Sequence, residues 1–355
     1  MLIRIILSRE RLCPSTLTIM TMGLRIAIYG FGEIGRLIAR VALSRGHEIV
    51  GVLDINPEIL GKDVGEILGL GKLGIKITRD VEEAVRRCDI TLHATGSYLP
   101  KVYDQIASVV MLGKPIISTC ETLAYPYYRY PILARRLDEL AKTHGSTILG
   151  SGINPGFLLD TLVIVTSATV PVIRRIRARR RLDASRRRSS FRRKIGLGLE
   201  PGEVADGLRS GKYSGHVGYA ESVCLIADAA GLNLSKVEEG QEPVIADQDV
   251  KAGSMIIEEG RVRGVRGYGA GYVDDVERIR VEFEAVAGIQ EYEEIIVEGE
   301  EYSVTWRSDG TPGDLGTASV ILSLTERVDR LPYGLLTMAD IIPFGIRFMG
   351  RRNSN

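Results

Sequence analysis

Cysteine and histidine are both scarce in this 355-residue chain, which has four of each. The cysteines stand far apart and form no Cys-x-x-Cys pair, which argues against a sequence-local zinc site or a dithiol redox motif. The histidines are equally dispersed, so we expect no metal site. Scattered thiols in a chain of this length are typical of a reducing compartment, which predicts a cytoplasmic protein.

The chain also lacks an excess of either charge. Lys plus Arg number 46 and Asp plus Glu number 45, a net charge of +1, whereas a dedicated nucleic-acid binder carries a strong basic excess. No clean apolar run of about 20 residues occurs, because Asp160 interrupts the most apolar stretch, residues 157–173. We therefore expect neither a nucleic-acid partner nor a membrane span.

The length favours two domains. Residues 1–22 carry too many charges for a signal peptide, and we expect either a disordered tail or a translation start assigned too far upstream. We then expect a dinucleotide-binding domain over 23–150 and a substrate and oligomerisation domain over 151–325. A C-terminal segment over 326–355 is expected to pack back on the first domain.

The first half alternates short apolar strands with helices. Strands are predicted at 24–29, 48–53, 90–94, 115–118 and 147–149. This alternation indicates an α/β fold with a Rossmann-type doubly wound parallel sheet. Further strands are predicted at 262–271, 276–286, 292–297 and 302–306. With few helices between them, they predict a second, α+β domain with a mostly antiparallel sheet.

A glycine-rich segment follows the first predicted strand, with the sequence Gly30-Phe31-Gly32-Glu33-Ile34-Gly35. It lies between a strand and a helix, and Asp54 follows 19 positions after its third glycine, which together form the dinucleotide-binding fingerprint. Gly30 permits the tight turn and Gly35 permits close packing of the helix. Gly32 lets the backbone approach a pyrophosphate at the helix N-terminus.

The identity of the dinucleotide is less sharply predicted. Asp54 can accept hydrogen bonds from ribose hydroxyls and would repel a 2′-phosphate, which slightly favours NAD over NADP. NADP remains an alternative cofactor, since the cationic side chain of Arg36 or Lys62 could still reach a 2′-phosphate. Asn56 is also expected to bind the cofactor. Because ligands bind at the carboxyl ends of strands in such sheets, the segment Thr95-Gly96-Ser97 is expected near the nicotinamide.

Two tracts of opposite charge mark the second half. Twelve of the 21 residues from 174 to 194 are Lys or Arg. Ile176, Ala178 and Leu182 alternate there with arginines, which predicts a strand with one basic face. Residues 238–301 hold 18 acidic and six basic residues. The two tracts could balance each other within the fold or across a subunit interface, and we expect a homodimer or a larger assembly.

Four segments resemble those of the 2,4-diaminopentanoate dehydrogenases and the related native amine dehydrogenases. They are 118–121 (STCE), 152–157 (GINPGF), 183–188 (DASRRR) and 215–218 (GHVG). The first half, with 54–57 (DINP) and 92–95 (LHAT), resembles the dihydrodipicolinate-reductase-like dehydrogenases, but the active-site segment of true dihydrodipicolinate reductases is missing. The resemblance implies an NAD(P)-dependent enzyme that converts a small-molecule amine or diamino acid to a ketone plus ammonia, or the reverse.

The resemblance also implies that Glu121 is the catalytic residue. Hydride loss from an amine carbon develops positive charge, which a carboxylate just past the carboxyl end of the predicted strand would stabilise. Other pocket candidates are an amide for a polar group, an aromatic wall, guanidinium groups for a substrate carboxylate, an imidazole and a hydroxyl. They are Asn154, Phe157, Arg179, Arg181, His216 and Thr317.

Two other hypotheses stay open at the level of sequence. One is another oxidoreductase on the same scaffold, dihydrodipicolinate-reductase-like or homoserine-dehydrogenase-like. An alcohol substrate needs a base, and only Lys101 and Lys114 are expected close to the nicotinamide. The other is a non-catalytic dinucleotide-binding protein, which needs the glycine loop but no carboxylate beside the nicotinamide. The position of Glu121 separates this last hypothesis from an amine dehydrogenase.

Overall fold

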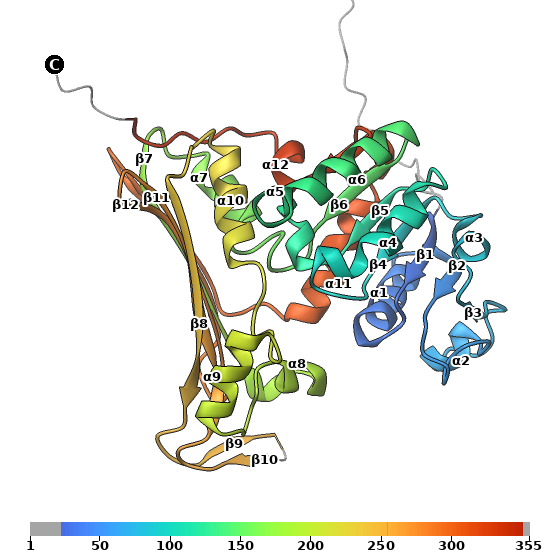
Figure 1. The fold of residues 1–355 in the computed structure, drawn as a ribbon, viewed down its shortest axis with the longest axis horizontal. Coiled ribbons are helices and arrows are strands. Elements are labelled where there is room, and N and C mark those ends of the chain that lie inside the picture. The colour runs from blue at the N-terminus through green and yellow to red at the C-terminus, as the bar shows by residue number, and fades with distance from the viewer. Residues whose placement is uncertain (1–22, 254, 351–355) are drawn as a thin grey trace, which may run out of the picture.

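A computed structural model describes residues 23–253 and 255–350, so the tail expected over 1–22 lies outside the described residues. The chain forms two large sheets (Figure 1). No helix in the described ranges is long and apolar enough to cross a membrane.

The first sheet has seven strands in the order β15-β6-β5-β4-β1-β2-β3, and every pairing is parallel. Its strands are β1 Arg25–Tyr29, β2 Glu48–Leu53, β3 Ile77–Thr78, β4 Ile90–His93, β5 Ile116–Ser118, β6 Thr147–Gly150 and β15 Gly334–Leu336. The connecting helices are α1 Glu33–Ser44, α2 Val64–Leu68, α3 Val81–Val85, α4 Leu99–Val110, η1 Glu121–Leu123, α5 Pro126–Arg129 and α6 Pro131–Thr143. The strands are short and largely buried, as expected for a parallel sheet covered on both faces. The predicted Rossmann-type sheet is confirmed.

The second sheet has six strands in the order β14-β13-β7-β12-β11-β8. Its strands are β7 Ile173–Asp183, β8 Lys236–Ile245, β11 Val262–Val273, β12 Val276–Val286, β13 Tyr292–Gly299 and β14 Ser303–Ser308. All pairings are antiparallel except that of β7 with β12, so the mostly antiparallel sheet is confirmed. A separate two-stranded ribbon pairs β9 Val250–Ala252 with β10 Met255–Ile257.

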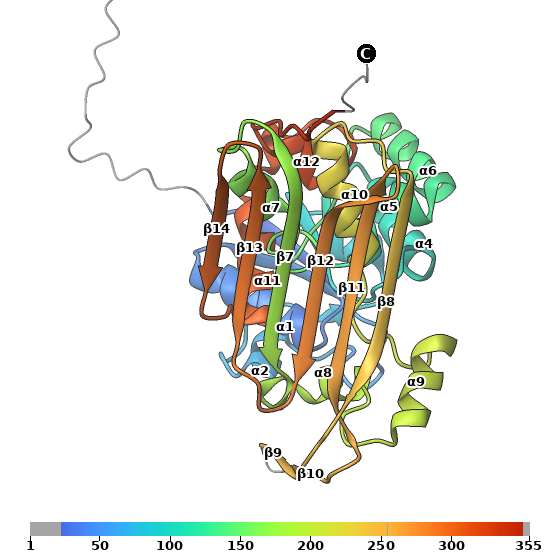
Figure 2. The same cartoon turned by 90° about the vertical axis from the view of Figure 1, so that its left-hand side faces the viewer.

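One face of the six-stranded sheet is covered and the other is open. The remaining helices are α7 Thr161–Ser167, η2 Ala184–Arg186, α8 Ser189–Lys194, α9 Pro201–Ser210, α10 Tyr219–Ala229, α11 Gly313–Thr325, η3 Val328–Arg330 and α12 Met338–Ile341. Helices α7 and α10 lie on the covered face, whereas no described helix crosses the face turned toward the viewer in Figure 2. One hydrophobic core cluster combines residues of both sheets, and a second packs the parallel sheet against α3, α4 and α6.

The chain returns to the first sheet after the second is complete. Helix α11 packs against α1, and β15 adds the last parallel strand beside β6. Ile153 and Thr317 also meet, through a 3.3 Å bond from the Ile153 N–H to the Thr317 hydroxyl. Segments far apart in sequence thus border the same space between the sheets.

Candidate functional site

The three glycines of the loop between β1 and α1 differ in their surroundings: two are required by close backbone packing, and one faces open space. Gly30 has a φ of 94°, and a Cβ on Gly35 would lie 1.9 Å from the carbonyl oxygen of Gly30, so the fold needs both. A Cβ on Gly32 would meet no atom within 4 Å. Helix α1 begins at this point without a side-chain cap, which leaves N–H groups to bind an anion. The loop therefore fits a dinucleotide pyrophosphate.

Asp54, just after β2, holds this loop in place. Its two carboxylate oxygens accept hydrogen bonds from the N–H groups of Phe31 at 2.6 Å and Asn56 at 2.8 Å. Each oxygen keeps a second lone pair that a ribose hydroxyl could use. Arg36 donates to the carbonyl of Phe31 at 3.0 Å. Phe31, Arg36, Asp54 and Asn56 thus lie together around the glycine loop.

The end of β4 carries a buried polar network. The His93 ring contacts the hydroxyls of Ser118 at 2.7 Å and Thr95 at 2.8 Å. Burial lowers the pKa of His93 to about 4, so the ring is neutral at pH 7. This neutral imidazole fixes two hydroxyl-bearing strand ends at the edge where a cofactor is expected to lie.

A cavity of about 300 Å³ opens between the two sheets beside this edge. The predicted residues that line it are Ile34, Thr95, Gly96, Ser97, Glu121, Asn154, His216 and Thr317. Glu33, Ile34 and Arg36 border an adjoining hollow along α1, which shares Arg188 and Asp314 with the cavity. The cavity thus joins the glycine-loop side of the molecule to the six-stranded sheet.

Glu121 begins the short helix η1 after β5 and lines this cavity. Its side chain is 22% exposed, and its carboxylate lies 3.3 Å from the ammonium nitrogen of Lys194. Lys194 is the last residue of α8. Glu121 is therefore a carboxylate that faces a partly enclosed space and not bulk solvent.

Asn154 and His216 form the far wall. The His216 Nε2 atom lies 2.9 Å from the Asn154 amide nitrogen, and its ring stacks on Phe283 with centroids 4.3 Å apart. Burial, together with the positive charges of Lys194 and Arg180, lowers the pKa of His216 well below its usual value. The amide oxygen of Asn154 is buried without a hydrogen-bond partner in the described chain. A donor on a bound ligand would satisfy it.

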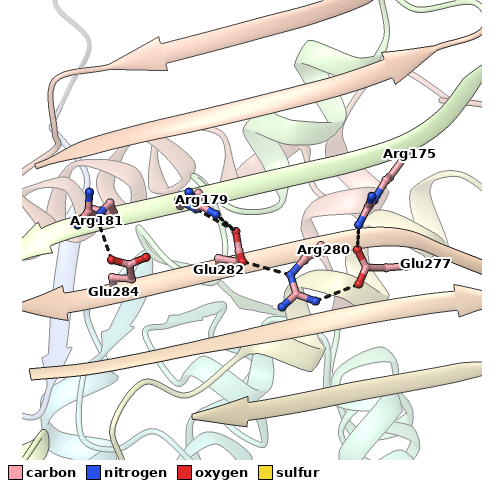
Figure 3. Close-up of polar contacts among 7 residues, drawn as sticks. All are labelled: Arg175, Arg179, Arg181, Glu277, Arg280, Glu282 and Glu284. Carbon is pink, nitrogen blue, oxygen red and sulfur yellow. Dashed lines mark hydrogen bonds and ion pairs between the residues drawn. The ribbon is translucent and has the colours of Figure 1, made fainter. Parts of the chain in front are cut away.

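Three predicted pocket residues do not line the cavity, and this corrects the sequence-based hypothesis. Arg179 and Arg181 point to the open face of the sheet, where they pair with Glu282 at 2.7 Å and Glu284 at 2.9 Å (Figure 3). Phe157 is also absent from the lining, and Phe191 and Phe283 supply the aromatic surface instead. Side chains alternate between the faces of a strand, so neighbours of Arg180 must point away from it.

On the open face of the six-stranded sheet, side chains of the basic tract form ion pairs with side chains of the acidic tract. Arg175, Arg179 and Arg181 on β7 face glutamates on β12, and Arg280 bridges Glu277 and Glu282 (Figure 3). The tracts therefore pair within the fold. These contacts are partly exposed, so each contributes little to stability.

Arg180, which the sequence reasoning missed, points into the cavity. It is 2% exposed, and its Nε lies 3.3 Å from a carboxylate oxygen of buried Glu293. Burial lowers the pKa of Arg180 to about 10, and Glu293 partly offsets this effect. The sequence did carry a signal, because Arg180 shares the register of the apolar residues Ile176, Ala178 and Leu182. Lys194, Arg187 and Arg188 also line the cavity. Arg187 and Arg188 belong to the segment 183–188 quoted for the resemblance but were not predicted as pocket residues, and no sequence pattern singled out Lys194.

No group of three or more potential metal ligands occurs within residues 23–253 and 255–350.

Comparisons with known proteins cover nearly the whole chain. Residues 157–353 match the family described as 2,4-diaminopentanoate dehydrogenase C-terminal domain, and residues 24–119 match dihydrodipicolinate reductase, N-terminus. The 2,4-diaminopentanoate dehydrogenase of Acetoanaerobium sticklandii is 31% identical over 329 residues, which is 89% of this chain and 93% of that protein. A 4-hydroxy-tetrahydrodipicolinate reductase of Archaeoglobus fulgidus is 39% identical over 61 residues, 17% of this chain and 23% of that protein.

A solved structure shares the fold. An amine dehydrogenase from Mycobacterium smegmatis superposes with a TM-score of 0.80 at 22% identity, covering 92% of this chain and 97% of that chain.

Proposed function

We propose that Glu121 is the catalytic carboxylate of this protein. The chain belongs to the 2,4-diaminopentanoate dehydrogenase family and is an NAD(P)-dependent dehydrogenase that acts on CH–NH2 groups. The observation that supports this role is the position of Glu121 in the cavity, at the end of the parallel sheet that carries the glycine loop. The reaction converts an amine, water and NAD(P)⁺ to a ketone, ammonium and NAD(P)H. Its reverse is reductive amination.

The proposed roles follow from charge. When bound, the nicotinamide dinucleotide supplies the hydride acceptor. Hydride can leave only a neutral amine, so the substrate ammonium must first lose a proton, which Glu121 can accept directly or through water. Once that proton has passed on to water, the carboxylate is ionised again and stabilises the iminium charge as it develops. The unpartnered amide oxygen of Asn154 can accept a hydrogen bond from the substrate nitrogen.

For the cofactor we propose NAD in preference to NADP. Asp54 lies where the adenosine ribose is expected, and its charge disfavours a 2′-phosphate. The loop glycines, the N-terminus of α1 and the segment Thr95-Gly96-Ser97 would hold the remainder of the dinucleotide. Three buried free cysteines, Cys88, Cys120 and Cys224, support a reducing, cytoplasmic location.

We also propose the domain division expected from the sequence, at 23–150, 151–325 and 326–355. It is supported by the end of β6 at Gly150 and by the return of the chain to the first sheet at β15.

A homodimer is proposed as the assembly, with the open face of the six-stranded sheet covered by a second copy. The support is that this broad face has no described helix over it (Figure 2), while its alternating Arg and Glu rows offer a charge pattern that a second copy can match. Light scattering at micromolar concentration should give twice the chain mass. A monomer would contradict this assignment.

Turnover is tested with a panel of amines and ketones. We expect NADH formation with an amine substrate and NADH consumption with ammonia and the corresponding ketone. Matched hydroxy compounds test the alcohol-dehydrogenase alternative, which needs a base near the substrate hydroxyl. Lys101 and Lys114, the lysines expected for that role, do not line the cavity, and the lysine that does, Lys194, is paired with Glu121. Turnover of the hydroxy compounds alone would contradict the amine assignment.

A further inference from the structure

A segment that follows β7 contacts the start of α1. It consists of Arg188 and helix α8, which begins at Ser189. The Nε atom of Arg188 lies 3.6 Å from a carboxylate oxygen of Glu33, the first residue of α1, and the Ser190 hydroxyl donates a hydrogen bond to the same oxygen. Glu33 directly follows Gly32, where a Cβ would meet no atom within 4 Å. A cation from the chain after β7 thus lies beside the expected pyrophosphate position.

Glu33 brings a negative charge to that position. It lies in the first turn of α1, and no side chain caps this helix. A carboxylate there stabilises the helix, because the N-terminal N–H groups carry partial positive charge. The pyrophosphate of a dinucleotide would bind the same N–H groups, so Glu33 would repel it at short range. A positive side chain at this point would offset the repulsion.

Arg188 can leave its present partners at small cost. Asp314 lies 2.8 Å from Arg187 and 3.3 Å from Arg188, so its carboxylate keeps one guanidinium when Arg188 moves. The side chain of Glu33 is 52% exposed, so water can solvate its carboxylate. Neither acid is therefore left buried and unpaired, which is the situation that makes a broken ion pair costly.

Other cationic side chains of the cavity are held more tightly. The Arg187 guanidinium lies 5.2 Å from the centroid of the Phe191 ring, and Arg180 is buried beside Glu293. Arg188 is 28% exposed, and its Nε atom is buried without a hydrogen-bond partner in the described chain. This N–H group can donate to a phosphate oxygen, and a guanidinium matches a phosphate with two parallel donors.

We propose that Arg188 is a cofactor-binding residue that pairs with the pyrophosphate of the dinucleotide. Its guanidinium exchanges Glu33 and Asp314 for phosphate oxygens, and Arg187 stays with Asp314. Arg188 lines both the cavity and the hollow along α1, so this exchange takes place where the two meet. The inference rests on the proposed function only in taking the glycine loop as the pyrophosphate site, and it does not involve Glu121 or the reacting amine.

ADP and adenosine test the inference without any turnover. ADP carries two linked phosphates like those of the dinucleotide, adenosine carries none, and neither contains a nicotinamide. The variant Arg188→Met keeps an unbranched side chain and removes its charge, whereas Arg188→Lys retains the charge. Arg186→Met is the matched control, because Arg186 lies two residues away, forms an exposed pair with Asp183 and does not line the cavity.

Calorimetry should show that Arg188→Met binds ADP and NAD⁺ about tenfold to hundredfold more weakly than the wild type, the range of a charge-assisted hydrogen bond. The affinity for adenosine should not change. Arg188→Lys should lie between the wild type and Arg188→Met, because lysine supplies the charge without the planar fork. Glu33→Gln should bind ADP more tightly, because it removes both the like charge and the competing partner of Arg188. Arg186→Met should match the wild type.

The inference is overturned if Arg188→Met binds ADP as the wild type does, if it loses adenosine affinity equally, or if Arg186→Met shows the same loss. It is also overturned if Arg188→Lys binds ADP no better than Arg188→Met, or if Glu33→Gln binds ADP more weakly than the wild type. Gly32→Val tests the loop separately: loss of ADP binding there, with full binding in Arg188→Met, removes only the role of Arg188. Binding of neither ADP nor NAD⁺ to the wild type overturns the loop assignment and this inference together.

Discussion

The two ends of the cavity differ in which atoms can contact a ligand. At the glycine-loop end, the groups that can meet a ligand are mainly backbone atoms of one short segment, fixed by Asp54. At the far end they are side chains from separated parts of the chain, such as Glu121, Lys194, His216 and Thr317. The first end depends on local sequence, whereas the second exists only when the whole chain has folded. Substitutions at the two ends should therefore have separable effects.

The largest effect is expected at the loop. Gly32→Val should abolish binding of NAD and NADP, because the side chain would occupy the space in which a Cβ meets no protein atom. The same open space means that the fold should tolerate the change. The measurement is cofactor affinity by calorimetry, with circular dichroism to check folding. A folded variant with wild-type affinity would refute the assignment of the loop.

Glu121→Gln should separate the two ends most clearly. The amide keeps the shape of the side chain and removes its charge, so proton transfer and iminium stabilisation are lost. We expect kcat for amine oxidation to fall roughly 10²-fold or more, the usual scale for a positioned acid–base group. Cofactor affinity should barely change. Wild-type turnover by this variant would be incompatible with the proposed mechanism.

A smaller effect is expected from Asp54→Asn. Removal of the charge should reduce discrimination against the 2′-phosphate, and the preference for NAD over NADP should fall by about tenfold, consistent with one charged hydrogen bond. The comparison is the ratio of the two dissociation constants in wild type and variant. An unchanged ratio would mean that another residue sets the cofactor preference.

The smallest effect is expected from Arg179→Met. Arg179 is 42% exposed in its pair with Glu282 on the open face, so its loss should cost less than about 1 kcal/mol of unfolding free energy. Amine turnover should stay close to that of the wild type. A drop of more than about tenfold in kcat/KM, a loss of about 1.4 kcal/mol or more, would place Arg179 in the substrate-binding machinery after all.

The sequence predicted the parallel sheet and the loop well because both follow from local patterns. The alternation of strands and helices and the spacing from Gly30 to Asp54 need no knowledge of distant contacts. The long strands β7, β11 and β12 were also predicted, from apolar alternation and strand-like runs. Prediction of Glu121 drew on its position after β5 and on the family resemblance.

Other features were missed for physical reasons. Helix α10 is buried around most of its circumference, so it lacks the one-sided apolar period that marks a surface helix. Strand β8 lies at the sheet edge and is rich in charged residues, which hides its alternation. The prediction of Arg179 and Arg181 in place of Arg180 assigned the wrong face of β7 to the cavity, because side chains of neighbouring residues point to opposite faces of a strand. Lys194 could not be predicted, since its contact with Glu121 spans 73 positions.

The late return of the chain at β15 has a consequence for synthesis on the ribosome. Strand β6 ends at Gly150, but its outer neighbour begins only at Gly334. During translation, β6 therefore presents an unpaired strand edge while more than half of the chain is still being made, and such edges invite association with other nascent chains. The last strand closes that edge only when the six-stranded sheet has already emerged. The order of the strands along the chain thus makes completion of the parallel sheet one of the final events of folding, after every cavity-lining residue has left the ribosome.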